Sequence, residues 1–355
     1  MPRHAGGSRA IEQQTRNGGI EGGRRMAINV NPTDGVDISL QKYISAREKT
    51  SHAHLVKGIP DYAFDLDIEM RRKIDAVPFM YKFFDYIMKT RMPMIRQQLN
   101  LECVLTGPSQ YPEIHEMGEE CARRLGIGIP KIYVKYDPYM NASAYAFDDA
   151  EPVIVMHSSL VEAMTPGELK TILGHECGHI HNNHVIYKMA GEIILAMGTG
   201  ATASILPDLS AFIGLFTVGV RVLFQDWSRC AEITCDRAGM INADDIKESS
   251  MALAKFAFGG ASALTGINIE EYIRQIDESQ STPGRLLEVF NTHPVTHKRL
   301  LAAKLFSRCD TLFKWRPEWK APDITIQPNQ LVDRKCREFI SVFRNAKKLD
   351  KGPKK

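Results

Sequence analysis

Four histidines lie within ten residues of the chain, in the stretch "ILGHECGHIHNNH" at 172–184. Histidine is the commonest metal ligand, so this cluster indicates a metal site. In a helix each residue turns by about 100°, which places His175 and His179 within about 40° of each other on one face. His181 and His184 point away from that face and cannot join the same ion unless the helix ends. We therefore expect the first two to be the ligands and the last two to be helix-end or packing residues.

Glu176 lies beside the face that carries His175 and His179. Histidine–glutamate–x–x–histidine is typical of zinc hydrolases, in which the histidines hold zinc and the glutamate accepts a proton from the attacking water. Zinc lowers the pKa of that water from ~15.7 toward ~7. A purely structural zinc site needs no such base and takes a fourth protein ligand. The alternative is that the motif arises by chance on a surface helix. Cys177 lies off the ligand face and is expected to be a packing residue.

The third ligand must come from another segment. One class of zinc peptidase supplies a histidine six residues after the second one, after a glycine turn, but Val185 and Asn182 occupy these positions. Glu192 follows the second histidine by only 13 residues, too few for an easy return of the chain. Glu232 is the better candidate, because Asp236 lies four residues later on the same helical face and could orient a ligand imidazole.

The segment "SRCAEITCDRAG" that carries both acids is rich in small side chains, which allow two helices to approach closely. These small residues are Ala231, Cys235, Ala238 and Gly239. The alternative is an exposed pair of acids, which would repel each other mildly and gain nothing from small neighbours.

The sequence also predicts the helices and strands that position these residues. Thr165 is expected to cap the motif helix, with Pro166 in its first turn and Glu168 completing a capping box. Three short strands are expected just before it, in "KIYVKYD", "NASAYAF" and "PVIVMHS". Helices are expected at 65–91 with a break at Pro78 and at 111–125 before Gly126. Others are expected at 228–243, 246–260, 284–290, 294–308 and 330–345.

The predicted fold class is α+β, mostly α, with a small sheet preceding the motif helix. We divide the chain into a disordered segment (1–25), a helical N-terminal region (26–110), a zinc metallopeptidase domain (111–308) and a C-terminal extension with a basic tail (309–355).

Composition excludes several classes of protein. Hydrophobic residues make up 44% and charged residues 25% of the 355, which is a globular balance, and a net charge of +3 gives no reason to expect nucleic-acid binding. The seven cysteines are scattered without a CxxC pair, which favours a reducing compartment over a disulfide framework. No secretory signal pattern is present. We expect a cytoplasmic protein.

Two apolar stretches, 193–206 and 211–224, complicate this expectation. Each is shorter than the roughly 20 residues that cross a bilayer. Two packed helices, or an apolar hairpin in peripheral contact with a membrane, are favoured over two membrane spans.

Three motifs in this order resemble zinc metallopeptidases of the HtpX and CAAX prenyl protease type, which are gluzincins. They are "HECGHIHNNH", "SRCAEITCDRAG" and "NTHPVTHKRL", preceded by "NASAY" and "TPGELKTILGHE". The resemblance covers roughly residues 110–308. Members of that family carry clear membrane spans, whereas the apolar stretches here are short, so the resemblance is to a soluble branch with a zincin-like domain.

The resemblance implies a role for each matching residue. His175, His179 and Glu232 would bind one zinc ion per chain, and Glu176 would be the general base. Asp236 would support a ligand, His293 would hydrogen-bond the developing oxyanion and Arg299 would hold that region together. The backbone at Asn141 and Ala142 would be the strand edge that receives a peptide.

The sequence therefore predicts a zinc endopeptidase that acts on peptides or unfolded proteins. Two alternatives remain: a catalytically silent zinc-bound, chaperone-like scaffold, and a peripheral membrane protein that uses residues 193–224. The oligomeric state and the physiological substrate do not follow from the sequence.

Overall fold

The computed structural model describes residues 54–145, 152–196, 218–258 and 296–340, with Asn268, Glu270, Glu271 and Arg274. Five sequence predictions lie wholly or mostly outside these residues. They are the disordered segment 1–25, the apolar stretches of 193–224 (of which 197–217 are not described), the helix at 284–290, the oxyanion residue His293 and the basic tail.

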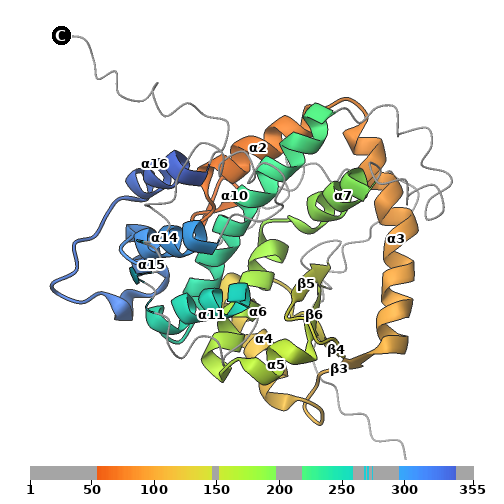
Figure 1. Cartoon of the computed structure of the whole chain (residues 1–355), viewed down its shortest axis with the longest axis horizontal. Coiled ribbons are helices and arrows are strands. Elements are labelled where there is room, and N and C mark those ends of the chain that lie inside the picture. The colour runs from red at the N-terminus through yellow and green to blue at the C-terminus, as the bar shows by residue number, and fades with distance from the viewer. Residues whose placement is uncertain are drawn as a thin grey trace, which may run out of the picture. The chain divides into compact units, whose positions relative to one another are not determined.

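The described chain begins with a short hairpin of β1 (Leu55–Val56) and β2 (Ile59–Pro60), followed by α2 (Asp65–Asp75) and α3 (Met80–Glu102). The predicted break at Pro78 is confirmed, because α2 and α3 are separate helices (Figure 1). Phe79 joins them with a left-handed backbone (φ 68°), which turns the chain into a new direction.

A four-stranded sheet has the strand order β3-β4-β6-β5. Strands β4 and β6 are parallel, whereas β3 and β5 are antiparallel edge strands of the described sheet. The bounds are β3 (Cys103–Leu105), β4 (Lys131–Lys135), β5 (Ala142–Tyr145) and β6 (Val153–His157). The three predicted strands are confirmed as β4, β5 and β6. Strand β3 was not predicted, because three residues are too few to show a period.

The two faces of the sheet pack against different helices, as alternation along a strand requires. Ile132 and Ile154 point into the main core with α4 (Pro112–Leu125) and α6 (Pro166–His181). Tyr133 and Val155 point to the other face and contact Leu99 of α3. Helix α4 ends at Gly126 (φ 72°), as predicted.

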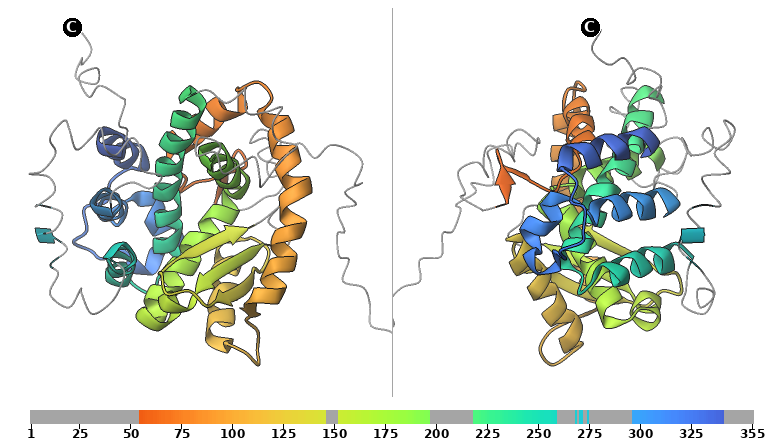
Figure 2. Two further views of the ribbon diagram at one scale, coloured as in Figure 1. Left: turned by 45° about the vertical axis from the view of Figure 1, so that its right-hand side comes forward. Right: turned by 90° about the vertical axis from the view of Figure 1, so that its left-hand side faces the viewer.

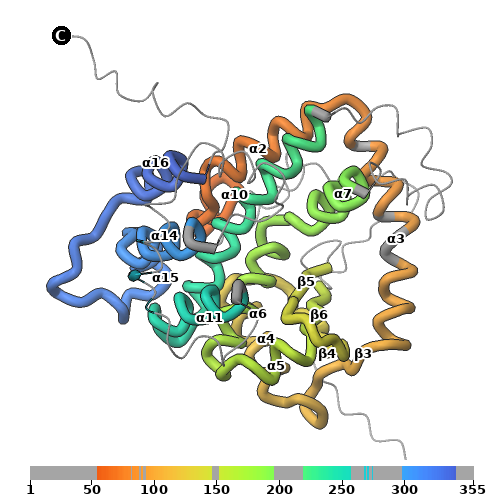
Figure 3. Tube along the Cα trace, viewed as in Figure 1, coloured from red at the N-terminus to blue at the C-terminus, as the bar shows by residue number. Residues whose placement is uncertain are grey.

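Helix α6 carries the histidine motif and packs along α10 (Val218–Asn242), the longest helix described (Figures 1 and 3). Between them in sequence lie α7 (Val185–Ala196) and residues outside the described chain. Helix α10 is described from Val218, ten residues before the predicted start at 228, and its first residues belong to the second apolar stretch. Helix α5 (Ser158–Ala163) joins β6 to α6.

Helices α11 (Ile246–Phe258), α14 (Thr296–Phe306) and α16 (Asn329–Ile340) lie one after another beside α10 (Figure 2). Helix α15 (Asp310–Trp315) and the short η3 (Pro317–Trp319) connect α14 to α16. One hydrophobic core runs from Tyr62 on the N-terminal side to Ile340, so the flanking segments pack with the central ones.

The predicted α+β, mostly α class is confirmed. Among the described helices, none combines the length and the apolar character that a membrane crossing requires.

Candidate metal centre

Helix α6 begins as its sequence predicts. Thr165 Oγ1 accepts a hydrogen bond from the Glu168 backbone N–H (3.3 Å), and Glu168 Oε2 accepts one from the Thr165 N–H (2.8 Å). Pro166 occupies the first turn, where its missing N–H costs nothing. This capping box fixes where the helix starts and therefore which face the histidines share.

The predicted close approach of α6 and α10 is confirmed. A Cβ added at Gly178 would lie 2.6 Å from Ala238 Cβ, and one added at Gly239 would lie 2.9 Å from the Thr171 carbonyl oxygen. Both distances are shorter than real Cβ contacts, so glycine is required at both positions. This contact brings the acids of α10 to the histidines of α6.

His175 and His179 both approach the carboxylate of Glu232, each at a different oxygen atom. His175 Nε2 lies 3.5 Å from Glu232 Oε2, and His179 Nε2 lies 3.4 Å from Glu232 Oε1. All three side chains are buried. Two ligands at 2.0–2.1 Å from a tetrahedral zinc are about 3.3 Å apart, so these separations suit a shared zinc ion. Two imidazoles and a carboxylate are also a donor set that zinc accepts.

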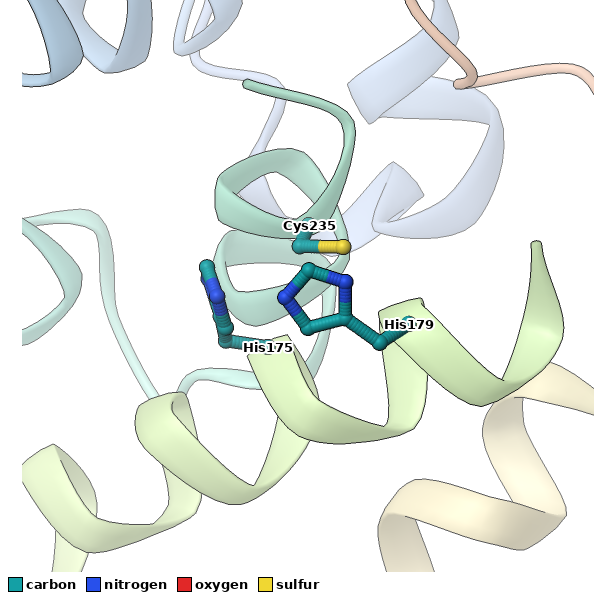
Figure 4. A group of neighbouring side chains, drawn as sticks. All are labelled: His175, His179 and Cys235. Atoms are coloured by element: carbon teal, nitrogen blue, oxygen red, sulfur yellow. The ribbon is translucent and has the colours of Figure 1, made fainter. Parts of the chain in front are cut away.

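Cys235 offers a different third donor. Its sulfur and one nitrogen from each of His175 and His179 lie within 4.8 Å of one another, and Figure 4 shows Cys235 next to the His179 ring. However, both Nε2 atoms face Glu232, whereas the Cys235 Sγ lies 3.5 Å from Nδ1 of His184. Burial raises the pKa of this thiol well above its usual value. Glu232 therefore suits the cation better.

Asp236 and Arg299 form a buried group behind His175. Asp236 Oδ1 lies 3.0 Å from His175 Nδ1, which leaves Nε2 free for a metal. Arg299 of α14 donates from Nε to Asp236 Oδ2 (2.8 Å), and its Nη1 lies 3.3 Å from Glu232 Oε2. Burial raises the pKa of Asp236, but Arg299 and His175 together outweigh burial and lower it below its usual value. Asp236 is therefore an anion that holds His175 in place.

The two histidines have opposite electrostatic environments. Burial lowers the pKa of His175, yet the hydrogen bonds to Asp236 and Glu232 outweigh it and raise the pKa to about 9. Burial also lowers the pKa of His179, and the Lys188 ammonium adds to that effect. Lys188 Nζ lies 3.3 Å from His179 Nε2 and 3.5 Å from Glu232 Oε1. Both rings contact Glu232, but Asp236 adds a second carboxylate at His175, whereas Lys188 opposes a charge on His179.

Glu176 is buried at 4% exposure beside His175. Within the described part of the chain, no group hydrogen-bonds its Oε2 atom. Burial raises the pKa of this carboxyl above its usual value, which increases its basicity. A buried carboxylate oxygen with an open lone pair beside a metal site can accept a proton from water.

A cleft of about 330 Å³ opens in front of these residues. Strand β5 forms one wall, and the predicted Asn141 and Ala142 line it. Glu192 of α7, the acid not favoured as third ligand, also lines the cleft. The Nε2 atoms of His175 and His179 face Glu232 instead.

Sequence reasoning missed Lys188 and Asp67 as neighbours of the metal centre. Lys188 follows four residues after His184, at the start of α7, and could be found only after the helix end is known. Asp67 lies more than 100 residues before the motif, in α2. His184 Nε2 lies 2.9 Å from Asp67 Oδ2, and no local signal indicates this contact.

The comparisons with known proteins agree with this geometry. The sequence matches peptidase family M48 over residues 108–305. It is 30% identical over 227 residues to "Plastoglobule-localized metallopeptidase 48, chloroplastic" of Arabidopsis thaliana, covering 63% of this chain and 64% of that protein. It is 34% identical over 129 residues to "Protease HtpX homolog 1" of Sulfurisphaera tokodaii, covering 36% and 37%. The chain thus spans less than two thirds of the length of these two relatives.

Among solved structures, the crystal structure of S. mikatae Ste24p matches with a TM-score of 0.39 and 18% sequence identity. The match covers 67% of this chain and 61% of that chain.

Proposed function

Because the chain belongs to peptidase family M48, we propose that it is a zinc-dependent endopeptidase that hydrolyses peptide bonds of peptides or unfolded proteins. The observation that carries this proposal is the convergence of His175 Nε2 and His179 Nε2 on the carboxylate of Glu232, at 3.5 and 3.4 Å. These three residues would hold one zinc ion per chain, with Asp236 and Arg299 supporting them. When bound, zinc supplies Lewis acidity and makes water a stronger acid near neutral pH.

Glu176 acts as the general base in this proposal. Its unpaired Oε2 and raised pKa suit it to take the proton from the attacking water and to deliver it to the leaving amine. A silent scaffold of the same fold would have no use for a buried carboxylate with an open lone pair.

The substrate backbone would lie along β5 as an additional strand. β5 is an edge strand of the described sheet and lines the cleft, so its outer N–H and C=O groups can bind an extended peptide at Asn141 and Ala142. Extended binding selects unfolded chains, because a folded substrate has no free backbone to offer. His293 is assigned to the oxyanion on the resemblance of its Thr-His-Pro motif.

The cellular location is part of the proposal. A cytoplasmic protein with peripheral membrane contact through residues 193–224 fits the apolar composition of that stretch. Flotation with liposomes at physiological salt tests the contact, and protein that stays at the bottom of the gradient contradicts it.

The function is tested by measuring zinc content and cleavage of a quenched peptide library. Glu176→Gln should keep zinc and lose activity by about 10²- to 10⁴-fold, because only the base is removed. His175→Ala should lose zinc and activity together. Glu192→Gln, a second acid of the cleft, serves as the matched control for zinc content and should keep the metal. Equal cleavage by wild type and Glu176→Gln would refute the mechanism.

A further inference from the structure

The ring of His179 contacts a second histidine that belongs to no proposed metal ligand set. His179 Nδ1 lies 3.2 Å from His184 Nδ1, and His184 Nε2 lies 2.9 Å from Asp67 Oδ2. All three side chains have 0% exposure. A buried row of polar contacts therefore runs from the candidate metal centre to helix α2.

The end of α6 explains why His184 reaches this place. Asn183 has a left-handed backbone (φ 55°), the His184 N–H donates to the His179 carbonyl (2.9 Å) and the Asn183 N–H donates to the Ile180 carbonyl (3.0 Å). This pair of bonds is the Schellman motif, which reverses the chain at the end of a helix. His184 therefore lies against His179, rather than on the far side of a continued helix as the sequence suggested.

The contacts allow one arrangement of the ring hydrogens of His179 and His184. If Nε2 of His179 binds a metal, its Nδ1 carries the hydrogen and donates to Nδ1 of His184. His184 then accepts at Nδ1 and carries its own hydrogen on Nε2, which faces the Asp67 carboxylate. A reversed His184 ring tautomer would place two N–H groups against each other at 3.2 Å and leave Asp67 facing a lone pair.

Asp67 is itself fixed to the helix that supplies Glu232. Its carboxylate accepts hydrogen bonds from Trp227 Nε1 (3.0 Å) and Thr234 Oγ1 (2.7 Å), both on α10. Arg71 Nε lies 3.3 Å from the same carboxylate and adds a buried positive charge. Four partners therefore hold Asp67 in one place relative to Glu232.

The same N-terminal segment also holds the turn after α6. Asn182 donates from Nδ2 to the Tyr62 hydroxyl (3.0 Å), and Arg71 donates from Nη1 to the Asn182 carbonyl. Tyr62 Oη lies 2.9 Å from His181 Nδ1. The ring of His184 also packs edge-on against Trp227, with centroids 5.7 Å apart. Thus Tyr62 and Arg71 hold the turn before His184, and Asp67 and Trp227 hold its ring.

We propose that His184 and Asp67 are positioning residues of the metal centre, which fix the tautomer and ring orientation of His179 so that its Nε2 faces Glu232. This inference rests on the proposed zinc site. It means that α2, which precedes the matched region 108–305, helps to position the residues of that site. Outer-sphere partners of a ligand histidine typically change metal affinity by 10- to 100-fold, and the same effect is expected here.

The test measures zinc affinity of the metal-free full chain by competition with a chromophoric chelator. His184→Phe keeps an aromatic ring against Trp227 but removes both nitrogens, and it should weaken zinc binding by about 10- to 100-fold. His184→Gln can still accept from His179 and donate to Asp67, so it should restore most of the affinity. Asp67→Asn keeps the volume of the carboxylate and should weaken binding by about 10-fold.

Asp333→Asn is the matched control for loss of stability. Asp333 is a buried carboxylate whose Oδ1 accepts from Arg237 Nη2 at 2.6 Å, and neither residue lines the cleft. It should lower the melting temperature without changing zinc affinity. The absorption spectrum of the cobalt-loaded protein is a second readout, since a reoriented His179 shifts the visible bands of His184→Phe but not those of Asp333→Asn.

The outcomes separate this inference from the proposed function. Wild-type chain that binds no zinc overturns both. If the wild type binds zinc and His184→Phe binds it with unchanged affinity, only the positioning role is overturned. Equal weakening in His184→Phe, His184→Gln and Asp333→Asn overturns the same role. Weakening in His184→Phe that His184→Gln reverses supports the role.

Discussion

The two histidines of the motif stand four residues apart on one helix, yet they are held in different ways. His175 contacts a carboxylate directly, Asp236 at 3.0 Å, and that acid is paired with Arg299. His179 reaches its carboxylate, Asp67, only through His184. The first support comes from helices inside the matched family region, and the second from a helix before it.

The difference teaches how a protein can give two histidines on one helix face, both proposed as ligands, unequal basicity. A direct anion raises the pKa of His175 to about 9 against the effect of burial. For His179 the supporting anion, Asp67, lies one ring further away, and burial and Lys188 outweigh Glu232 and keep its pKa low. Both rings direct Nε2 toward Glu232, but only His175 has a raised pKa.

The largest expected effect comes from removing Glu232, the carboxylate that both histidines contact. Glu232→Ala should weaken zinc binding by more than about 100-fold, beyond the range of outer-sphere changes, because a ligand is lost. Cys235→Ser, one turn along α10, is the matched control and should bind zinc as the wild type does. Chelator competition measures both, and zinc loss in Cys235→Ser instead would make the thiol the third ligand.

The next effect compares the two supports directly. Asp236→Asn should weaken zinc binding by about 10- to 100-fold and more than Asp67→Asn does, since Asp236 contacts its ligand without an intermediate. It should also destabilise the fold by about 1–3 kcal/mol, because Arg299 keeps Glu232 but loses the second of its two buried acidic partners. Zinc competition and urea unfolding measure the two effects. A smaller loss of affinity than in Asp67→Asn would contradict the comparison.

A smaller effect, of opposite sign, is expected on the His179 side alone. Lys188→Met removes an ammonium that contacts His179 Nε2 and Glu232, so zinc affinity should rise by up to about 10-fold, since like charges near 4 Å repel by ~1 kcal/mol even in water. Lys170→Met is the matched control, because Lys170 pairs with Glu120 and Asp244 outside the cleft. Tighter binding in both variants would point to a general charge effect.

The smallest effect concerns the start of the helix that carries both histidines. Thr165→Ala removes one half of the capping box and should lower the free energy of unfolding by about 1 kcal/mol, read from urea denaturation. Neither histidine support is touched, so zinc affinity should not change. A change in affinity would show that the position of α6 is less firmly held by α10 than its packing indicates.

Much of the fold around the site could be predicted because its signals are local. The capping box at Thr165, the break at Pro78 and the short apolar runs of β4 and β6 each depend on residues within a few positions of one another. Strand β3 could not be predicted, because it is three residues long and owes its structure to pairing with β4. The first ten described residues of α10 were missed, because the apolar stretch 211–224 carries no helix signal of its own.

The sequence by itself determined the half of the centre that lies on one helix, and it indicated the other half. Helical geometry puts His175 and His179 on one face, and the small residues of α10 mark a helix that can come close enough to supply Glu232. Both inferences follow from spacing and side-chain size, which the sequence states.

Only the tertiary structure decided how His179 is held. The helix ends at His181, so His184 turns back towards His179 instead of pointing away, and Asp67 arrives from a helix far away in the sequence. Periodicity describes a helix only while the helix continues, and a contact between distant segments follows from packing of the whole core. Asn183 at the turn was the one local sign of this reversal, and its meaning depends on where the helix stops.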